Sequence, residues 1–272
     1  PLDCHPSLQD ILFGGRSSRR ISRCFTAYAN HGELIAMKFV VQQHEPTTVP
    51  VRLDAQAEVS EQTPRFPVHR IYCVGRNYSE HVKEMGGDPK QEPPVFFSKP
   101  ANACVTFNQD VAYPQATNDL HYEVELVVTL KSGGKDIDLG AAMDCVYGYA
   151  VGIDFTRRDL QDIAKSKGRP WDLAKGFDQS APISAILPVS EVAQLGDRQI
   201  SLKLNDETRQ QASLNEMIWS VPEIIAELSK YFELKSGDII YTGTPSGVAA
   251  ATKGDRIVAC VEGVGALDFR IV

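Results

Sequence analysis

Two glutamates separated by a single residue, Glu123 and Glu125, are the first candidates for chemistry in this chain. Side chains alternate between the two faces of a β-strand, so in a strand both glutamates point the same way, about 6.5 Å apart. Two carboxylates held this close repel each other unless a cation lies between them. Oxygen ligands favour a hard divalent ion, Mg²⁺ or Mn²⁺, over zinc. The alternative interpretation is the ordinary solvated face of a strand.

A metal site of this kind needs a third carboxylate, and Asp154 is the candidate. It ends the apolar run 149–153, at the point where a predicted strand meets a helix that we expect to begin at Thr156. A lone aspartate in that place is also a common helix cap, so both interpretations stay open at this point.

Further polar residues could supply acid–base and electrostatic chemistry. His81 and Glu84 are spaced three apart on a predicted helical turn and share a face. A carboxylate beside an imidazole makes a water-activating base, although a surface contact has the same spacing. Lys175 has apolar neighbours, which predicts an ion-pair member or an electrostatic catalyst. The turn 242–247 could hold an anionic group or be purely structural.

The composition excludes several classes of protein. The chain has 272 residues, 28 Lys and Arg against 35 Asp and Glu, and a net charge of −7, which argues against a nucleic-acid partner. No apolar run approaches the roughly 20 residues of a membrane helix. The six cysteines include no C-x-x-C pair, which favours free thiols in a reducing compartment. No nucleotide-binding loop or serine-hydrolase elbow is present.

The elements that must position these residues are mostly strands. We expect strands at 70–74, 95–98, 123–130, 148–154, 200–204, 238–241, 256–260 and 267–272. We expect helices over 156–167 and from Ser220, where Glu223 completes a capping box. The second helix should bury one apolar stripe: Val221, Ile224, Ile225, Leu228 and Phe232. Strands outnumber helices, which predicts an α+β, mainly β protein with a mixed sheet coiled upon itself.

The chain divides by texture into three segments. Residues 1–36 include an Arg-rich, acid-free stretch that is typical of a targeting leader. The alternative interpretation is that this segment is not native to the protein, since Met37 resembles a translation start. Residues 37–70 are β-like pieces broken by prolines and predict a small N-terminal arm. Residues 71–272 form the predicted catalytic domain. We expect a cytoplasmic protein, or a mitochondrial one if the leader is a transit segment.

Five motifs in one order make residues 71–272 resemble the fumarylacetoacetate hydrolase superfamily. They are residues 74–84, residues 121–126, residues 154–161, Lys175, and residues 242–245. Within the superfamily, segments 92–100, 168–172 and 175–182 look most like the bacterial fumarylpyruvate hydrolases and related acylpyruvases. Many relatives have a second histidine where Tyr122 stands, but this side chain alternates away from the two glutamates.

The resemblance implies a coiled mixed β-roll, a homodimer and one Mg²⁺ or Mn²⁺. It assigns the metal to Glu123, Glu125 and Asp154. It makes His81 and Glu84 a water-activating dyad on a lid, and Lys175 the partner of an oxyanion. The residues that it places at the substrate are Arg76, Arg158, Gln161 and, for the substrate carboxylate, Thr244.

The activity that the resemblance implies is hydrolysis of a carbon–carbon bond in an acylpyruvate. A small 2-oxo acid is the substrate, fumarylpyruvate yielding fumarate and pyruvate. Decarboxylation or keto–enol tautomerisation of oxaloacetate is the alternative, because the same site stabilises the enolate in all three reactions. A catalytically silent metal-binding protein and a purely structural protein are two further alternatives.

Overall fold

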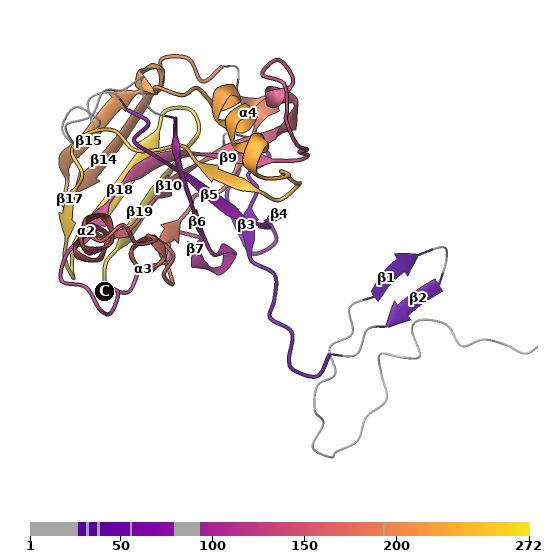
Figure 1. The fold of residues 1–272 in the computed structure, drawn as a ribbon, viewed down its shortest axis with the longest axis horizontal. Helices are drawn as coiled ribbons and strands as arrows, with labels where there is room; N and C mark the ends of the chain where they lie inside the picture. Colours follow the sequence, from indigo (N-terminus) through magenta and orange to yellow (C-terminus); the bar gives the residue numbers. More distant parts are fainter. Residues whose placement is uncertain (1–26, 31–32, 37–38, 55, 79–92, 193) are drawn as a thin grey trace, which may run out of the picture. The chain divides into compact units, whose positions relative to one another are not determined.

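The computed structural model describes residues 27–30, 33–36, 39–54, 56–78, 93–192 and 194–272 (Figure 1). Two compact units are present, Pro1–Glu45 and Pro46–Val272. In the first, β1 (Ala27–Asn30) pairs antiparallel with β2 (Glu33–Ala36). All remaining described elements belong to the second unit. No helix among the described residues is long and apolar enough to span a membrane.

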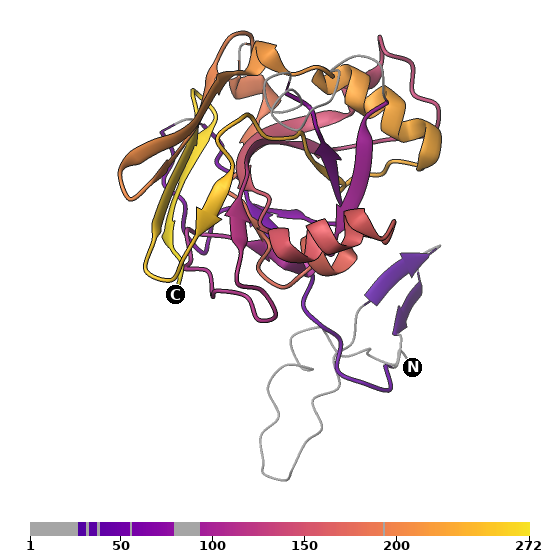
Figure 2. The same ribbon diagram turned by 60° about the vertical axis from the view of Figure 1, so that its left-hand side comes forward.

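A six-stranded sheet forms the centre of the second unit. Its strands lie in the order β13 (Leu187–Pro188), β10 (Val146–Ile153), β9 (Val124–Leu130), β16 (Ile239–Tyr241), β5 (Ile71–Gly75) and β6 (Val95–Lys99). Only the pair β16–β5 is parallel, so the sheet is mixed, as the sequence predicts. Figure 2 shows the strands curving around instead of lying flat.

Smaller sheets and short helices complete the unit. A four-stranded antiparallel sheet has the order β15 (Glu207–Ser213), β14 (Gln199–Leu204), β18 (Arg256–Val261) and β19 (Gly265–Arg270). A three-stranded sheet contains β11 (Thr156–Arg157), β8 (Leu120–Tyr122) and β17 (Ala249–Ala251). Two-stranded pairs join β12 (Ala181–Pro182) to β7 (Cys104–Val105) and β3 (Thr48–Pro50) to β4 (Arg65–Pro67). The α-helices in the described part of the chain are α2 (Arg158–Ser166), α3 (Asp172–Lys175) and α4 (Val221–Tyr231). The predicted class, α+β with mainly β structure, is confirmed.

Strand β9 is buried on both of its faces. Val124, Leu126 and Val128 belong to one apolar core cluster, while Val127 belongs to another on the opposite side of the sheet. All seven residues of the strand are buried. The glutamates of this segment therefore do not lie on the ordinary solvated face that was their alternative interpretation.

The helix that carries part of the predicted site begins later than expected. Thr156 and Arg157 pair with His121 and Leu120 as strand β11, so α2 starts at Arg158 and not at Thr156. Helix α4 begins as predicted, with the backbone N–H of Ser220 donating to Glu223 at 2.8 Å. The expected apolar stripe is buried except for Phe232, which follows the helix as its C-cap and is 40% exposed.

Candidate metal centre

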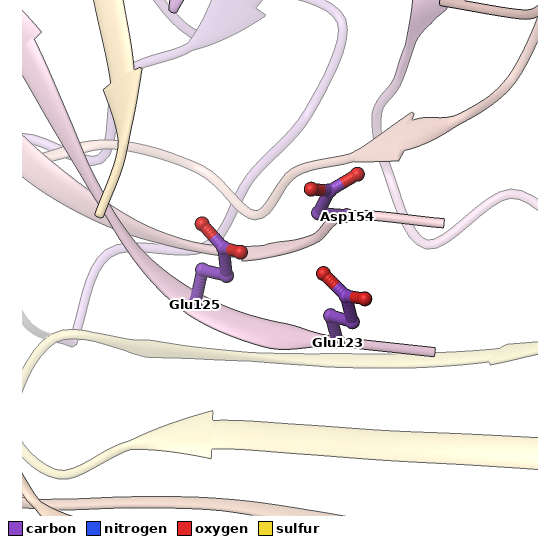
Figure 3. Close-up of side chains that lie close together, drawn as sticks. All are labelled: Glu123, Glu125 and Asp154. Atoms are coloured by element: carbon purple, nitrogen blue, oxygen red, sulfur yellow. The ribbon is translucent and has the colours of Figure 1, made fainter. Parts of the chain in front are cut away.

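The register between β9 and β10 places Asp154 beside the two glutamates. Gly152 lies opposite Glu125, and the backbone N–H of Asp154 donates to the carbonyl of Glu123 at 2.8 Å. One carboxylate oxygen of each acid lies within 4.8 Å of the others, and Figure 3 shows the three carboxylates gathered together. Glu123 is 7% exposed, Glu125 1% and Asp154 0%. The structure thus brings the three predicted ligands to one buried place.

Two cations contact the carboxylates of Glu123 and Asp154. The Nζ of Lys175 donates to Glu123 Oε2 and to Asp154 Oδ2, each at 2.8 Å. Arg158 donates to Glu123 Oε1 at 2.5 Å. Burial by itself would raise the pKa of Glu123, but the charges of Lys175 and Arg158 outweigh it and lower that pKa. Burial would lower the pKa of Lys175, and the two carboxylates raise it instead, so Lys175 stays an ammonium.

Glu125 has a different environment. Its Oε2 accepts a hydrogen bond from the backbone N–H of Gly243 at 2.8 Å. Burial, and after it the charges of Asp154 and Glu123, raise the pKa of Glu125 well above its ordinary value. Gly243 has φ +96°, and a Cβ there would lie 2.7 Å from the Cβ of Asn77, so this turn requires glycine. The glycine therefore lets the turn approach closely enough to bond Glu125.

The donor set fits a hard divalent cation. Among the described residues, Glu125 forms no ion pair, whereas Asp154 is paired with both Lys99 and Lys175 at 2.8 Å. A buried carboxylate without an ion pair, as in Glu125, gains most from a cation. Mg²⁺ and Mn²⁺ prefer oxygen ligands, and three carboxylates would leave positions for a substrate or water.

A pocket opens beside the carboxylates and contains most of the other predicted site residues. Its lining includes Glu123 and Glu125 and these five predicted side chains: Arg76, Arg158, Gln161, Lys175 and Thr244. His81 and Glu84, the predicted dyad, lie outside the described residues. Tyr122 is fully buried in the core cluster that contains Val124.

Gln210 joins two backbone segments of the site and was not predicted from the sequence. Its Oε1 accepts from the backbone N–H of Val124 at 3.0 Å, and its Nε2 donates to Thr244 Oγ1 and to the carbonyl of Pro245, each at 2.8 Å. This amide therefore ties the first residue of β9, which lies between the two glutamates, to the turn that carries Thr244. Its place in the polar segment 207–213 gave no signal of burial, yet it is 1% exposed.

Lys99 is a second buried group that the sequence analysis missed. It is 3% exposed, and its Nζ donates to the carbonyls of Phe155 and Lys175 in addition to its ion pair with Asp154. No local signal marked it, because lysine is almost never fully buried unless it is paired, and the partners of Lys99 are distant in the chain.

Comparisons with known proteins agree on the family of this chain. Residues 70–272 match the family described as fumarylacetoacetate (FAA) hydrolase C-terminal. A rat protein named oxaloacetate tautomerase FAHD1, mitochondrial, is 44% identical over 201 residues, covering 74% of this chain and 90% of the relative. A fumarylpyruvate hydrolase from Ralstonia is 41% identical over 184 residues, covering 68% of this chain and 95% of the relative. The crystal structure of a Pseudomonas aeruginosa fumarylpyruvate hydrolase in complex with Mn²⁺ and pyruvate matches with a TM-score of 0.80 and 44% identity, covering 86% of this chain and 99% of that one.

Proposed function

Because this chain belongs to the fumarylacetoacetate hydrolase family, we propose that it is a divalent-metal-dependent hydrolase that cleaves a carbon–carbon bond of an acylpyruvate, with fumarylpyruvate as the substrate. The observation that carries the proposal is the convergence of Glu123, Glu125 and Asp154 within 4.8 Å in a buried site beside a pocket. The Pseudomonas structure, with Mn²⁺ and pyruvate bound, supports both the ion and the 2-oxo acid.

In this proposal Glu123, Glu125 and Asp154 hold Mn²⁺ or Mg²⁺. When bound, the ion would act as a Lewis acid toward the oxygens of the 2-oxo acid. Lys175 reaches two of the three carboxylates and also lines the pocket, so its ammonium is placed to donate to an oxyanion. Arg158 donates to Gln161 at 2.5 Å, which fixes both side chains at the pocket wall for the substrate.

The proposed reaction uses one water per cleavage. His81, oriented by Glu84, takes a proton from the water, whose oxygen adds to the distal carbonyl carbon. Lys175 donates hydrogen bonds to the oxyanion that forms. The carbon–carbon bond then breaks, its electron pair passes to the pyruvate enolate, and protonation of the enolate carbon gives pyruvate. The acyl group leaves as a carboxylate, which is fumarate when fumarylpyruvate is the substrate.

Tautomerisation of oxaloacetate is the second candidate function. The rat relative with that name is 44% identical to this chain, about the same level as the fumarylpyruvate hydrolases. Tautomerisation and decarboxylation of oxaloacetate both pass through an enolate, so the same carboxylates, Lys175 and pocket would serve them. Neither reaction needs a water to attack carbon, and this is where the candidates differ.

The deciding experiment is a parallel assay of the purified protein with Mn²⁺ or Mg²⁺. The substrates are fumarylpyruvate, acetylpyruvate and oxaloacetate, the last followed for both enol–keto conversion and loss of CO₂. The proposal expects the highest kcat/KM with fumarylpyruvate and no turnover after EDTA treatment. Turnover of oxaloacetate alone would replace hydrolysis with tautomerase or decarboxylase activity, and metal-independent or absent turnover would contradict the proposal.

Assembly and location extend the proposal. We expect a homodimer, which light scattering of the purified full chain measures directly. We expect the protein in the cytoplasm, or in mitochondria if residues 1–36 act as a transit segment, since the rat relative is named mitochondrial. Imaging of residues 1–36 fused to a fluorescent protein distinguishes the two locations.

A further inference from the structure

Helix α2 presents a third polar side chain to the pocket. Arg158, Gln161 and Lys165 are spaced at i, i+3 and i+7, which places them on one face of the helix. All three side chains line the pocket beside the carboxylates. Lys165 stands farthest along the helix from Arg158, the residue that bonds Glu123. The helix therefore extends the polar wall of the pocket away from the carboxylate cluster.

An aromatic wall runs between Lys175 and Lys165. The Nζ of Lys175 lies 5.0 Å from the ring centroid of Phe97, and the Phe97 and Trp171 rings lie 5.8 Å apart at 59°. The Nζ of Lys165 lies 5.5 Å from the Trp171 ring. Phe97 and Trp171 both line the pocket. A ligand that begins at Lys175 can thus run past two aromatic rings and end at a second ammonium.

The pocket is positively charged although the whole chain is acidic. Its lining contains four cationic side chains, Arg76, Arg158, Lys165 and Lys175, against the two glutamates. Lys175 and Arg158 are bonded to carboxylates, whereas Lys165 forms no ion pair with any described residue. A half-buried ammonium in such surroundings is stabilised by an anion that enters the pocket.

The electrostatics of Lys165 agree with this geometry. Burial lowers the pKa of Lys165, the positive charges of Arg158 and Arg76 add to that effect, and the negative charges of Asp162 and Glu123 offset only part of it. The net effect acts against the charged form of Lys165, so an anionic group near Nζ would relieve it.

We propose that Lys165 binds the distal carboxylate of a dicarboxylic 2-oxo acid and so makes the pocket prefer dicarboxylic to monocarboxylic substrates. The inference rests on the proposed function, because it takes the 2-oxo acid end to lie at Glu123, Glu125 and Asp154. The inference adds to that function a carboxylate at the far end of the substrate and names Lys165 as the residue that binds it.

Kinetics of Lys165→Gln test the proposal. With Mn²⁺ present, we expect kcat/KM for fumarylpyruvate to fall about 10- to 100-fold, mainly through KM, because a charge-assisted hydrogen bond is lost. For acetylpyruvate, which has no distal carboxylate, we expect a change of less than about 2-fold. Lys167→Gln is the matched control, since it removes an exposed lysine near the end of the same helix. Equal losses for both substrates, or no loss for either, would overturn the assignment.

A binding experiment separates this inference from the proposed function. Calorimetry with Mn²⁺ compares 2-oxoglutarate with 2-oxopentanoate, which have the same chain length and differ in the distal carboxylate. The wild-type protein should bind 2-oxoglutarate more tightly, and Lys165→Gln should reduce that preference about tenfold or more. Since no turnover is needed, the preference can be measured even if every assayed activity is absent. An unchanged preference in Lys165→Gln contradicts the role of Lys165 whatever the activity.

Discussion

The ammonium of Lys99 lies 2.8 Å from Oδ1 of Asp154, and neither side chain has any exposed surface. The same ammonium donates to the carbonyl of Phe155 at 3.0 Å and to the carbonyl of Lys175 at 2.5 Å. One buried charge thus fixes a carboxylate of the metal centre and the backbone that carries the candidate oxyanion partner. Lys99 is a positioning residue, because it does not line the pocket and acts on it through Asp154 and Lys175.

We therefore predict that Lys99→Met destabilises the protein by about 3 kcal/mol, because it removes one of the two cations paired with the buried Asp154 and leaves the carbonyls of Phe155 and Lys175 without this donor. Urea unfolding followed by circular dichroism measures the change. Lys203→Met, at an exposed position of β14, is the control and should change the free energy of unfolding by less than about 0.5 kcal/mol. A stable Lys99→Met protein with unchanged Mn²⁺ affinity would show that Asp154 needs no support from Lys99.

Addition and removal of metal test the three carboxylates. Mn²⁺ at about 100 times its dissociation constant should stabilise the folded protein by about 2.7 kcal/mol, and EDTA should reverse this. Glu125→Gln should abolish the shift in Tm, because an amide is a poor ligand for a hard ion yet can still accept from Gly243. Glu207→Gln, at the exposed first position of β15, should keep the full shift. A full shift in Glu125→Gln would contradict the ligand assignment.

The local part of the site could be predicted from the sequence. The period of two in a strand places Glu123 and Glu125 on one face, and that argument needs no tertiary information. The nearness of Asp154 follows from the antiparallel register of β9 and β10, in which Gly152 lies opposite Glu125. Spacing in the sequence does not encode that register, so the convergence was known only through the family resemblance.

The parts that were missed depend on tertiary burial. Strand β15 has a polar sequence and lies at the edge of its sheet, so nothing in its pattern marked Gln210 as buried. The roles of Lys99 and Lys165 depend on contacts with carbonyls and a ring of other chain segments, which only the tertiary fold brings near. The start of helix α2 was misplaced because Thr156 finds a strand partner in His121, and tertiary pairing then overrides the local helix signal.

The proposed base, His81, can be tested although it lies outside the described residues. We predict that His81→Ala lowers kcat for fumarylpyruvate hydrolysis by about 100-fold or more, because general-base assistance is lost. Binding of pyruvate in the presence of Mn²⁺ should stay within about 2-fold of wild type, since the proposed ligands are unchanged. Stopped-flow kinetics and calorimetry supply the two measurements. Loss of both hydrolysis and pyruvate binding would assign His81 to binding or folding.

The last prediction concerns the anchoring of helix α2, which carries Arg158, Gln161 and Lys165. The Asp159 carboxylate accepts from Thr117 Oγ1 at 2.7 Å and from the backbone N–H of Asn118 at 3.1 Å. Burial would raise the pKa of Asp159, but these hydrogen bonds outweigh it and lower that pKa. The stabilisation is therefore fully present above the unfolded pKa of about 3.9 and is lost as the pH falls through the lower folded value.

Asp159→Ala should accordingly cost about 1 kcal/mol at pH 7, and the difference from wild type should shrink as the pH falls below about 3.9. Urea midpoints at a series of pH values measure it, with Asp197→Asn, an exposed aspartate away from helix α2, as the control. Because Asp159 holds the 117–118 loop against the first turn of the helix, the same variant should also raise KM for fumarylpyruvate. A difference in stability that grows with acidity would reverse the sign and remove Asp159 as the anchor, since protonation must weaken a carboxylate that accepts these hydrogen bonds.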